Sequence, residues 1–544
     1  MRIGLVLLVA LVAWVYWPAT GADFIIDDYV FIATSRMVDN PLAAFWQSHF
    51  YEPYYFRPVG LITWWLATRE FFLDYQAHSV VNLAIHAVSV CSLAGLLRTL
   101  GATRTAALTA ATLFALMPFS LAATLWPSNR FDLLAVLFLI WLAMAVLSVL
   151  RGGALGAPGA WVGAALCALA ACWSKELAYP AATLIALSVL GARSVSLPRR
   201  IGLFVLLSGV ISFAFFWRQS VLDSPYAAAG GDVIASFQRG ATAWADGLLL
   251  FTRYTLFSSL LMFGLVVAAL AAAFLLRAHT ERRRFGQNAH VDDAARRRLI
   301  GLTLVAAAVL ATVCAVQWPL AHVFVGMLDG GALGTVTYGR FFYAPMAAFA
   351  VLAGLLLTAT RYPRLCASLI IVPTLWIGVE SRPLAEAFAQ WTRKEIRPFS
   401  LAATTVADAQ PLDAPCVLVL LGTQMSHPYF RMFSDVTVKA RSEKPANAWR
   451  CYVMSESTPW LFAFPSAATP APPNLLSVAG EGAERVAKPD SEWGGMRYRY
   501  KSPPKDVSAL PDARFYEWRD GAFVEVTAEV KSGARVVKFH GWGF

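Results

Sequence analysis

Long apolar runs recur along the chain up to about residue 380. A helix needs about 20 apolar residues to cross a hydrocarbon layer of ~30 Å, and about eleven runs reach or approach that length. The pattern predicts an α-helical polytopic membrane protein. We expect its helices over residues 3–17, 79–97, 105–122, 131–150, 160–173, 177–191, 201–219, 247–276, 299–318, 341–360 and 364–380.

The pattern changes near residue 381. PCVLVLLG, at 415–422, predicts a buried strand ending in a glycine turn, and residues 514–530 predict a hairpin across Asp520 and Gly521. A Pro-rich stretch at 465–474 is typical of a linker. We therefore predict two domains: a membrane module over 1–381 that contains an outer loop at 18–78, and a small α/β domain over 382–544.

Composition supports the membrane assignment. The chain is 58% hydrophobic and 15% charged, which is too apolar for a soluble globular protein. The net charge of +11 does not indicate nucleic acid, because many basic residues lie in short stretches between apolar runs. If the N-terminus is cytoplasmic, each loop then predicted to be cytoplasmic is basic, as the positive-inside rule requires. The outer loop and the C-terminal domain then lie on the periplasmic or extracytoplasmic side of the inner (plasma) membrane.

The first apolar run is open to two interpretations. Small residues in ATGA offer a signal-peptide cleavage site, whereas Trp14, Tyr16 and Trp17 form an aromatic belt that favours a retained helix. Both interpretations place Asp27 and Asp28 outside the membrane.

Two of the seven cysteines, Cys416 and Cys451, lie in the predicted outer domain. An oxidising compartment makes a disulfide between them plausible, although sequence gives no distance between two thiols.

The outer loop is long enough to contain its own helices. Asn40 followed by Pro41 predicts the start of a short helix. The apolar stretch at 58–75 contains Arg69, Glu70 and Asp74. We therefore expect it to lie along the membrane interface instead of spanning it.

Several charged residues fall at predicted outer helix ends, where orientation does not require basic residues. One account is snorkelling to the headgroups or pairing with a carboxylate; the other is a shared anion, which the number of cations favours. The residues are Arg57, Arg130, Lys175 with Glu176, Arg218 and Arg340.

Lys175 lies between two short runs, 160–173 and 177–191. Each run would span roughly 20 to 23 Å as a helix, less than a full crossing. We expect their junction below the outer membrane surface, beside a cavity suited to the phosphate of a long-chain lipid.

His78, Asn82 and His86 recur every four residues and share a helix face. The two histidines are about 12 Å apart along the axis, too far to share one metal ion. A polar stripe facing the bundle interior is the alternative that we favour. No CxxC or HExxH pattern indicates a zinc site.

The order of motifs resembles a known superfamily. An outer loop with DD is followed by YYFRPVG, HSVVNLAIH, LFALMPFSLAATLWPSNRFDLL, WSKELAYP and YGRFFYAP. This order is similar to that of GT-C polyprenyl-phosphate-dependent membrane glycosyltransferases, above all protein O-mannosyltransferases and the tetratricopeptide-repeat transmembrane mannosyltransferases. Bacterial aminoarabinose transferases are more distant relatives. The resemblance covers roughly residues 1–360, and the chain lacks the tetratricopeptide repeats.

The resemblance implies that the first acidic residue of the pair, Asp27, is the catalytic base, with Asp28 supporting it. A leaving phosphate needs no general acid, so one carboxylate suffices to take the acceptor proton, and cations stabilise the departing phosphate. We expect donor-phosphate contacts from Arg57, Lys175, Arg130 and Arg340, with Glu176, His78, Asn82 and His86 supporting. No cofactor is required; a divalent metal is conceivable, but ligand spacing does not support one.

The expected partners are a polyprenyl-phosphate sugar donor, membrane lipid, and a protein, glycolipid or glycan acceptor. Three other classes stay open: a lipid-linked glycan flippase or other transporter, a surface polysaccharide polymerase, and a structural or sensor protein. For the acidic pair itself, the alternative is that Asp27 caps a helix beginning near Asp28.

Overall fold

The computed structural model describes residues 1–47, 49, 56–152, 158–192, 195–222, 293–325, 340–358, 360, 363–411, 416–423, 428–443, 451–455, 460–463, 483–487, 496–500 and 513–537. The predicted helix at 247–276 and the predicted linker at 465–474 lie outside these residues.

The chain divides into two compact units. The helical unit comprises Met1–Thr20, Ser79–Arg218 and Ala229–Phe388, and the mixed unit comprises Gly21–His78, Gln219–Ala228 and Ala389–Phe544. Most of the predicted outer loop therefore belongs to the same unit as the C-terminal segment. The division at residue 381 into a membrane module and an outer domain stays a prediction.

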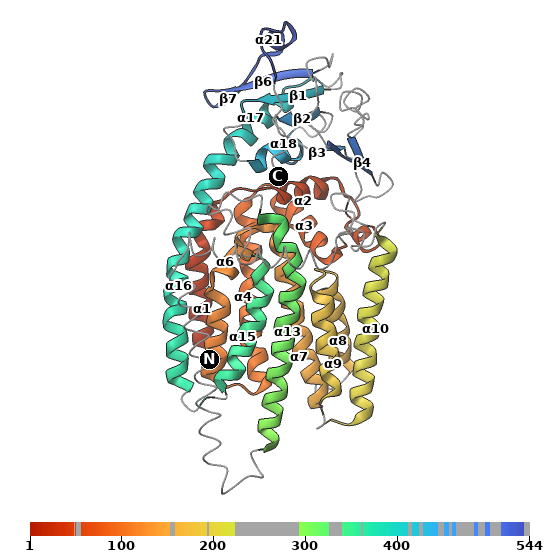
Figure 1. Cartoon of the computed structure of the whole chain (residues 1–544), viewed down its shortest axis with the longest axis vertical. Helices are drawn as coiled ribbons and strands as arrows, with labels where there is room; N and C mark the ends of the chain where they lie inside the picture. The colour runs from red at the N-terminus through yellow and green to blue at the C-terminus, as the bar shows by residue number, and fades with distance from the viewer. Residues whose placement is uncertain are drawn as a thin grey trace. The chain divides into compact units, whose positions relative to one another are not determined.

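The helical unit is a bundle of apolar helices (Figure 1). Helices suit a lipid environment because they satisfy their own backbone polar groups. Its described helices are α1 (Arg2–Tyr16), α4 (Tyr75–Leu100), α5 (Arg104–Leu116), α6 (Pro118–Leu125), α7 (Arg130–Arg151), α8 (Pro158–Cys172), α9 (Ala178–Leu190), α10 (Leu197–Val221), α13 (Asp293–Val325), α15 (Tyr343–Thr358) and α16 (Pro363–Trp391). Three of them, α4, α10 and α16, have an end in the mixed unit.

Within the described ranges, six helical stretches are long and apolar enough to cross a membrane. A seventh follows if the bent pair α5 and α6 counts as one span. The apolar helices α8 and α9 have only 15 and 13 residues, which confirms two short helices on either side of Lys175. The predicted class, a polytopic helical protein with a small α/β part, is confirmed, whereas the number of about eleven spans stays a prediction.

Small residues let the helices approach closely. Helix α7 packs against α8 and α9, and buried alanines of α8 and α9, such as Ala164 and Ala182, lie in their shared core. Helix α15 packs against α5 and α13. A Cβ at Gly354 of α15 would lie 2.7 Å from the Leu97 side chain, so a larger residue would force these helices apart.

The mixed unit combines helices from both ends of the chain. Helix α2 (Asp27–Met37) packs on α3 (Pro58–Phe71) and on α18 (Pro428–Arg441), which in turn packs on α17 (Arg397–Asp408). The π-helix η8 (Thr392–Ile396) joins α16 to α17. The outer-loop helix α2 is therefore anchored on a helix of the C-terminal segment.

Two small sheets complete the mixed unit. The first has the order β2-β1-β6-β7, with β1 parallel to β2 and β6 and with β7 antiparallel to β6; the second has the order β3-β5-β4 and is antiparallel. The strands are β1 (Cys416–Leu421), β2 (Cys451–Ser455), β3 (Trp460–Ala463), β4 (Ala483–Ala487), β5 (Met496–Tyr500), β6 (Ala513–Arg519) and β7 (Ala522–Glu525).

Three local predictions are confirmed. The first is β1, which ends at Gly422, where φ is +74°. The second is the β6–β7 hairpin, which turns at Asp520 and Gly521 with φ of +49° and +87°, the left-handed backbone that a tight two-residue hairpin requires. The third is the short helix Pro41–Phe45, for which the Asn40 side chain accepts the Leu42 N–H.

The prediction of a disulfide is confirmed at Cys451, which is disulfide-bonded. Five cysteines in the helical unit are free. The seventh cysteine of the chain is Cys416. Its backbone lies opposite that of Cys451 in the β1–β2 register, but its side chain is not among those that the structure describes.

We predict that Cys451→Ser lowers the unfolding midpoint of the mixed unit. A crosslink between residues 416 and 451 closes a loop of about 35 residues, and the chain-entropy account gives at most about 4 kcal/mol for such a loop. Thermal unfolding with and without reductant measures the effect. A wild-type midpoint for Cys451→Ser, together with insensitivity of the wild type to reductant, would contradict this prediction.

Candidate functional site

The acidic pair opens helix α2. The helix begins at Asp27, and its N-cap is Ile26, whose side chain makes no capping hydrogen bond. The alternative that Asp27 caps a helix starting at Asp28 is therefore wrong by one residue. Instead, the carboxylate of Asp28, inside the helix, accepts the backbone N–H of Ile25, which lies three residues earlier, at 3.0 Å. Both carboxylates lie in the first turn, where the helix dipole favours negative charge.

The two carboxylates differ in exposure. Asp28 is 0% exposed, whereas Asp27 is partly exposed. Successive helical residues project about 100° apart, so the two carboxylates point in different directions; the residues that follow Asp28, up to Ser35, are buried as well. Asp27 is the member of the pair that a substrate can reach.

The backbone before the pair is strained. Ile26 has φ +44° and ψ −111°, a conformation in which a β-branched residue is an outlier. Such a conformation costs on the order of 1–3 kcal/mol and persists only where the surroundings hold it. The surroundings of residues 23–28 therefore determine where the Asp27 carboxylate lies.

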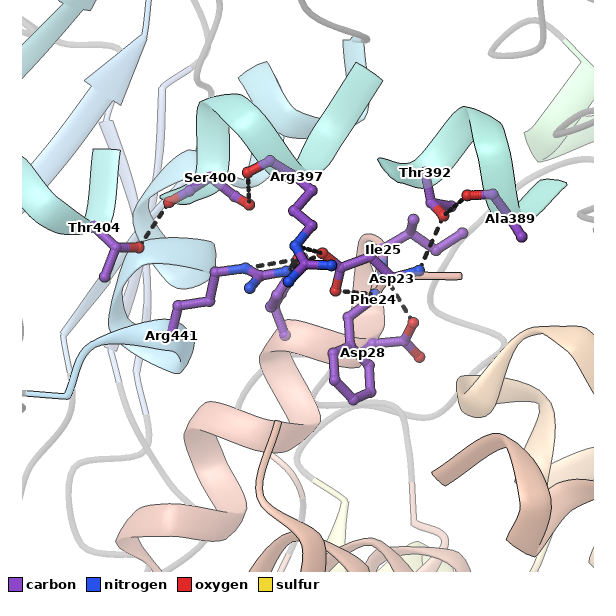
Figure 2. Close-up of polar contacts among 11 residues, drawn as sticks. Asp23, Phe24, Ile25, Asp28, Ala389, Thr392, Arg397, Ser400, Thr404 and Arg441 are labelled. Atoms are coloured by element: carbon purple, nitrogen blue, oxygen red, sulfur yellow. Dashed lines mark hydrogen bonds and ion pairs between the residues drawn. The ribbon is translucent and has the colours of Figure 1, made fainter. Parts of the chain in front are cut away.

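The main anchor of this segment is Asp23, which the sequence analysis did not single out. Its carboxylate accepts from Arg441 Nη2 at 2.5 Å and lies 3.8 Å from Arg397 Nε. Figure 2 shows both guanidinium groups converging on Asp23, and Thr392 on the opposite side, where its Oγ1 accepts the Asp23 N–H at 2.9 Å. Asp23 is 6% exposed, so its charge depends on these partners.

The π-helix η8 presents two of these partners together. Its wider turn places the Arg397 N–H on the Thr392 carbonyl, five residues back. The Thr392 side chain then contacts the Asp23 backbone N–H, and the Arg397 side chain contacts the Asp23 carboxylate. A regular α-helix, with 3.6 residues per turn, would rotate residues five apart away from each other.

Arg441 also binds the tyrosine of α2. Its Nε and Nη2 donate to the Tyr29 hydroxyl at 3.0 and 2.8 Å. Burial lowers the pKa of the Arg441 guanidinium, but Tyr29 and Asp23 together raise that pKa above its ordinary value. Burial raises the pKa of the Tyr29 hydroxyl. Arg441 is therefore a permanent cation that joins Asp23 to a neutral Tyr29.

Arg57 and His78 also belong to the mixed unit. Arg57 is partly exposed at the N-cap of α3. His78 is buried; its Nε2 donates to the Phe72 carbonyl at 3.0 Å, and its ring lies 5.3 Å from that of Phe24. His78 thus packs against the residue that follows Asp23.

In the helical unit, Lys175 forms a buried ion pair, as one of the two accounts from sequence allowed, with a partner that the sequence analysis did not name. Its Nζ lies 2.5 Å from Asp132 Oδ2, and the two side chains are 10% and 3% exposed. Asp132 lies in the first turn of α7. Its other oxygen, Oδ1, has no hydrogen-bond partner among the described residues. Glu176, next to Lys175, is partly exposed.

Arg130 and Arg340 have different surroundings. Arg130 is 0% exposed, and its Nε donates to Asn82 Oδ1 at 3.0 Å. The Asn82 amide donates in turn to the Trp126 carbonyl at 3.2 Å. Arg340 is partly exposed, with its guanidinium carbon 4.7 Å from the centre of a Trp126 ring. Of the two, Arg340 is the one accessible to a ligand.

The predicted polar stripe faces the interior. Asn82 and His86 are both 0% exposed. His86 Nδ1 lies 3.0 Å from the Tyr343 hydroxyl, and its Nε2 lies 3.3 Å from the Ala115 carbonyl. Arg218, at the end of α10, is also buried. Within the residues that the structure describes, no three His, Cys, Asp or Glu side chains form a group that could hold a metal ion.

Comparisons with known proteins give structural similarities only. No protein-family model and no curated protein matches the chain. The chain is similar to the oligosaccharyltransferase of Archaeoglobus fulgidus in a complex with zinc and sulfate, at 15% identity and TM-score 0.43, over 83% of this chain and 67% of that one. A second structure of that enzyme, tethered with an acceptor peptide, gives 12% identity and TM-score 0.41 over 81% of this chain; the chain spans only 62% of its length.

The chain is also similar to ArnT from Cupriavidus metallidurans. The apo structure gives 15% identity and TM-score 0.35, over 91% of this chain and 97% of that one. At TM-scores below 0.5, these similarities do not assign a function to the chain.

We predict that Lys175→Ala destabilises the helical unit by about 3–5 kcal/mol, because it leaves a buried carboxylate unpaired. The double variant Lys175→Ala/Asp132→Ala should be less destabilised than Lys175→Ala alone. Arg382→Ala is the matched control, since Arg382 and Glu386 form an exposed pair in α16 worth about 0–1 kcal/mol. Unfolding midpoints of the purified variants measure all three. Equal midpoints for Lys175→Ala and Arg382→Ala would show that the buried pair is not stabilising.

Proposed function

We propose that the chain is an inverting membrane glycosyltransferase with Asp27 as its base. It moves a sugar from a polyprenyl-phosphate donor to a hydroxyl acceptor on the outer face of the membrane. The observation that carries this proposal is the pairing of a partly exposed Asp27 with a buried, hydrogen-bonded Asp28 behind a strained Ile26. Backbone strain held in place by surrounding contacts is typical of functional sites.

The chemistry needs one carboxylate. The acceptor oxygen forms a bond to the anomeric carbon of the sugar while its proton passes to the Asp27 carboxylate. The bond from that carbon to the phosphate oxygen breaks, and its electron pair leaves with the polyprenyl phosphate. Because the phosphate is a stable anion, no acid has to protonate it, unlike the leaving group of a glycosidase. One displacement inverts the anomeric carbon, and Asp27 then loses its proton to water.

Exposure changes the roles proposed for the four cations. Arg57 and Arg340 are partly exposed, so we assign direct phosphate contacts to them. Lys175 is 8% and Arg130 0% exposed, and both bind protein groups. We assign these two to the support of the site, with Glu176, His78, Asn82 and His86. The acceptor, whether protein, glycolipid or glycan, and the transferred sugar stay open.

We predict that Asp27→Asn lowers turnover by about 10²-fold or more, because an amide cannot take the acceptor proton. Asp28→Asn should cost less, since an amide oxygen can still accept the Ile25 N–H. Release of undecaprenyl phosphate from undecaprenyl-phosphate mannose and related donors, in membranes that contain the acceptor, measures turnover. An inactive Asp28→Asn beside an active Asp27→Asn would reverse the roles, and two active variants would remove this loop from the chemistry.

We predict that Arg57→Ala and Arg340→Ala weaken donor binding, by about tenfold or more for each lost charge-assisted contact. Arg382→Ala, again the exposed-arginine control, should bind the donor like the wild type. Titration with undecaprenyl phosphate alone measures affinity without transfer. Wild-type affinity in both Arg57→Ala and Arg340→Ala would exclude them from the phosphate site.

Mass spectrometry of glycolipids, glycoproteins and surface glycan from cells with and without the protein would identify the acceptor. A transporter would instead change the amount of lipid-linked sugar on each side of the membrane while leaving Asp27→Asn active.

A further inference from the structure

The acidic segment is fixed by side chains that come from the other end of the chain. Asp23 binds Arg441, Arg397 and Thr392, more than 360 residues away in sequence. Tyr29 binds the same Arg441. The contacts to Arg441 thus lie on both sides of Asp27, at Asp23, four residues before it, and at Tyr29, two residues after it. Figure 2 shows the contact to Asp23.

The strained residue lies between these two contacts. Ile26, with φ +44°, falls between Asp23 and Tyr29, and the local bonds Phe24 N–H to Asp23 Oδ1 and Ile25 N–H to Asp28 Oδ2 fold the chain back at this point. A conformation of this kind relaxes when its surroundings stop holding it. The Arg441 guanidinium, bound to Asp23 before Ile26 and to Tyr29 after it, is a restraint of this kind.

A second arginine makes the reciprocal contact. Arg36, in the last turn of α2, donates from Nη1 to the carbonyls of Ala440 and Ser442 at 3.0 Å each. These carbonyls lie at the C-terminal end of α18, where a cation is favourable. Helices α2 and α18 are therefore joined at both ends of α2, by Arg441 at its start and Arg36 at its end.

We infer that Arg441 is a positioning residue for transfer: by binding Asp23 and Tyr29 together, it fixes the strained segment that sets the place of the Asp27 carboxylate. This inference rests on the proposed function. It makes the C-terminal segment part of the catalytic apparatus, because the base is placed by a residue on α18. Donor binding should not depend on Arg441, since the proposed phosphate contacts lie elsewhere.

The test is Arg441→Gln in the full-length protein in lipid nanodiscs. With undecaprenyl-phosphate mannose, or whichever related donor the wild type accepts, we expect kcat to fall about 10- to 100-fold, the effect of displacing a reacting group by a fraction of an ångström to 1 Å. The donor KM should stay unchanged. Hydrogen exchange of the peptide covering residues 21–37 should speed up. Arg441→Lys keeps the charge without the fork and should recover part of both losses.

Two further variants complete the design. Arg519→Gln makes the same chemical change at a guanidinium that is 44% exposed in the same unit, and should leave kcat and exchange at wild-type values. Asp23→Asn/Arg441→Gln should be no worse in kcat than the worse single variant, because both residues act through one contact.

Wild-type kcat in folded Arg441→Gln, or a loss of kcat without faster exchange at 21–37, would overturn the inference. If Arg441→Gln does not accumulate as folded protein, Arg441→Lys decides by the same two measurements. Full activity of Asp27→Asn would refute the proposed function itself. An inactive Asp27→Asn beside a fully active Arg441→Gln would refute only the positioning role.

Discussion

The ion pair between Asp23 and Arg441 is the interaction on which the acidic segment depends. A buried carboxylate without a partner costs several kcal/mol, and Asp23 is 6% exposed. Arg441 and Arg397 supply the positive charge that makes the burial of the carboxylate tolerable, and the Thr392 hydroxyl accepts the Asp23 backbone N–H. The same contact joins helix α18 to the segment at the start of α2. The need to pair the buried Asp23 carboxylate therefore also favours the packing of α2 on α18.

Two buried cations in the helical unit are also paired with groups from distant segments. Lys175 pairs with Asp132, and Arg130 binds Asn82, whose amide bonds the backbone at Trp126 and Pro127. Both of these cations have a partner that lies more than 40 residues away in sequence. These pairs add little net stability compared with apolar packing, but breaking one is costly. The loss of either partner would therefore be costly at these positions.

The pair Asp27 and Asp28 illustrates how one helical turn separates two roles. Both residues gain from the positive end of the helix dipole, but they project about 100° apart, and Asp28 is buried whereas Asp27 is partly exposed. Asp28 then stabilises the chain reversal through Ile25. In the proposed reaction a base needs both a fixed position and access to its substrate; Asp28 holds a backbone contact, and Asp27 is the partly exposed member of the pair.

The sequence by itself determined the class of protein and its local elements. Apolar run length predicted the helices, including the short α8 and α9, and alternation with turn residues predicted β1 and the β6–β7 hairpin, because these features depend on neighbours in sequence. Only the tertiary structure showed that Asp23 is bound by Arg441 and that Lys175 is bound by Asp132. In both cases the partner of the buried charge comes from a segment that is distant in sequence, and a single sequence contains no record of which distant residues meet. The structure also showed that the helix starts at Asp27. Its N-cap, Ile26, makes no side-chain capping bond, and the Asp28 carboxylate accepts the Ile25 N–H instead.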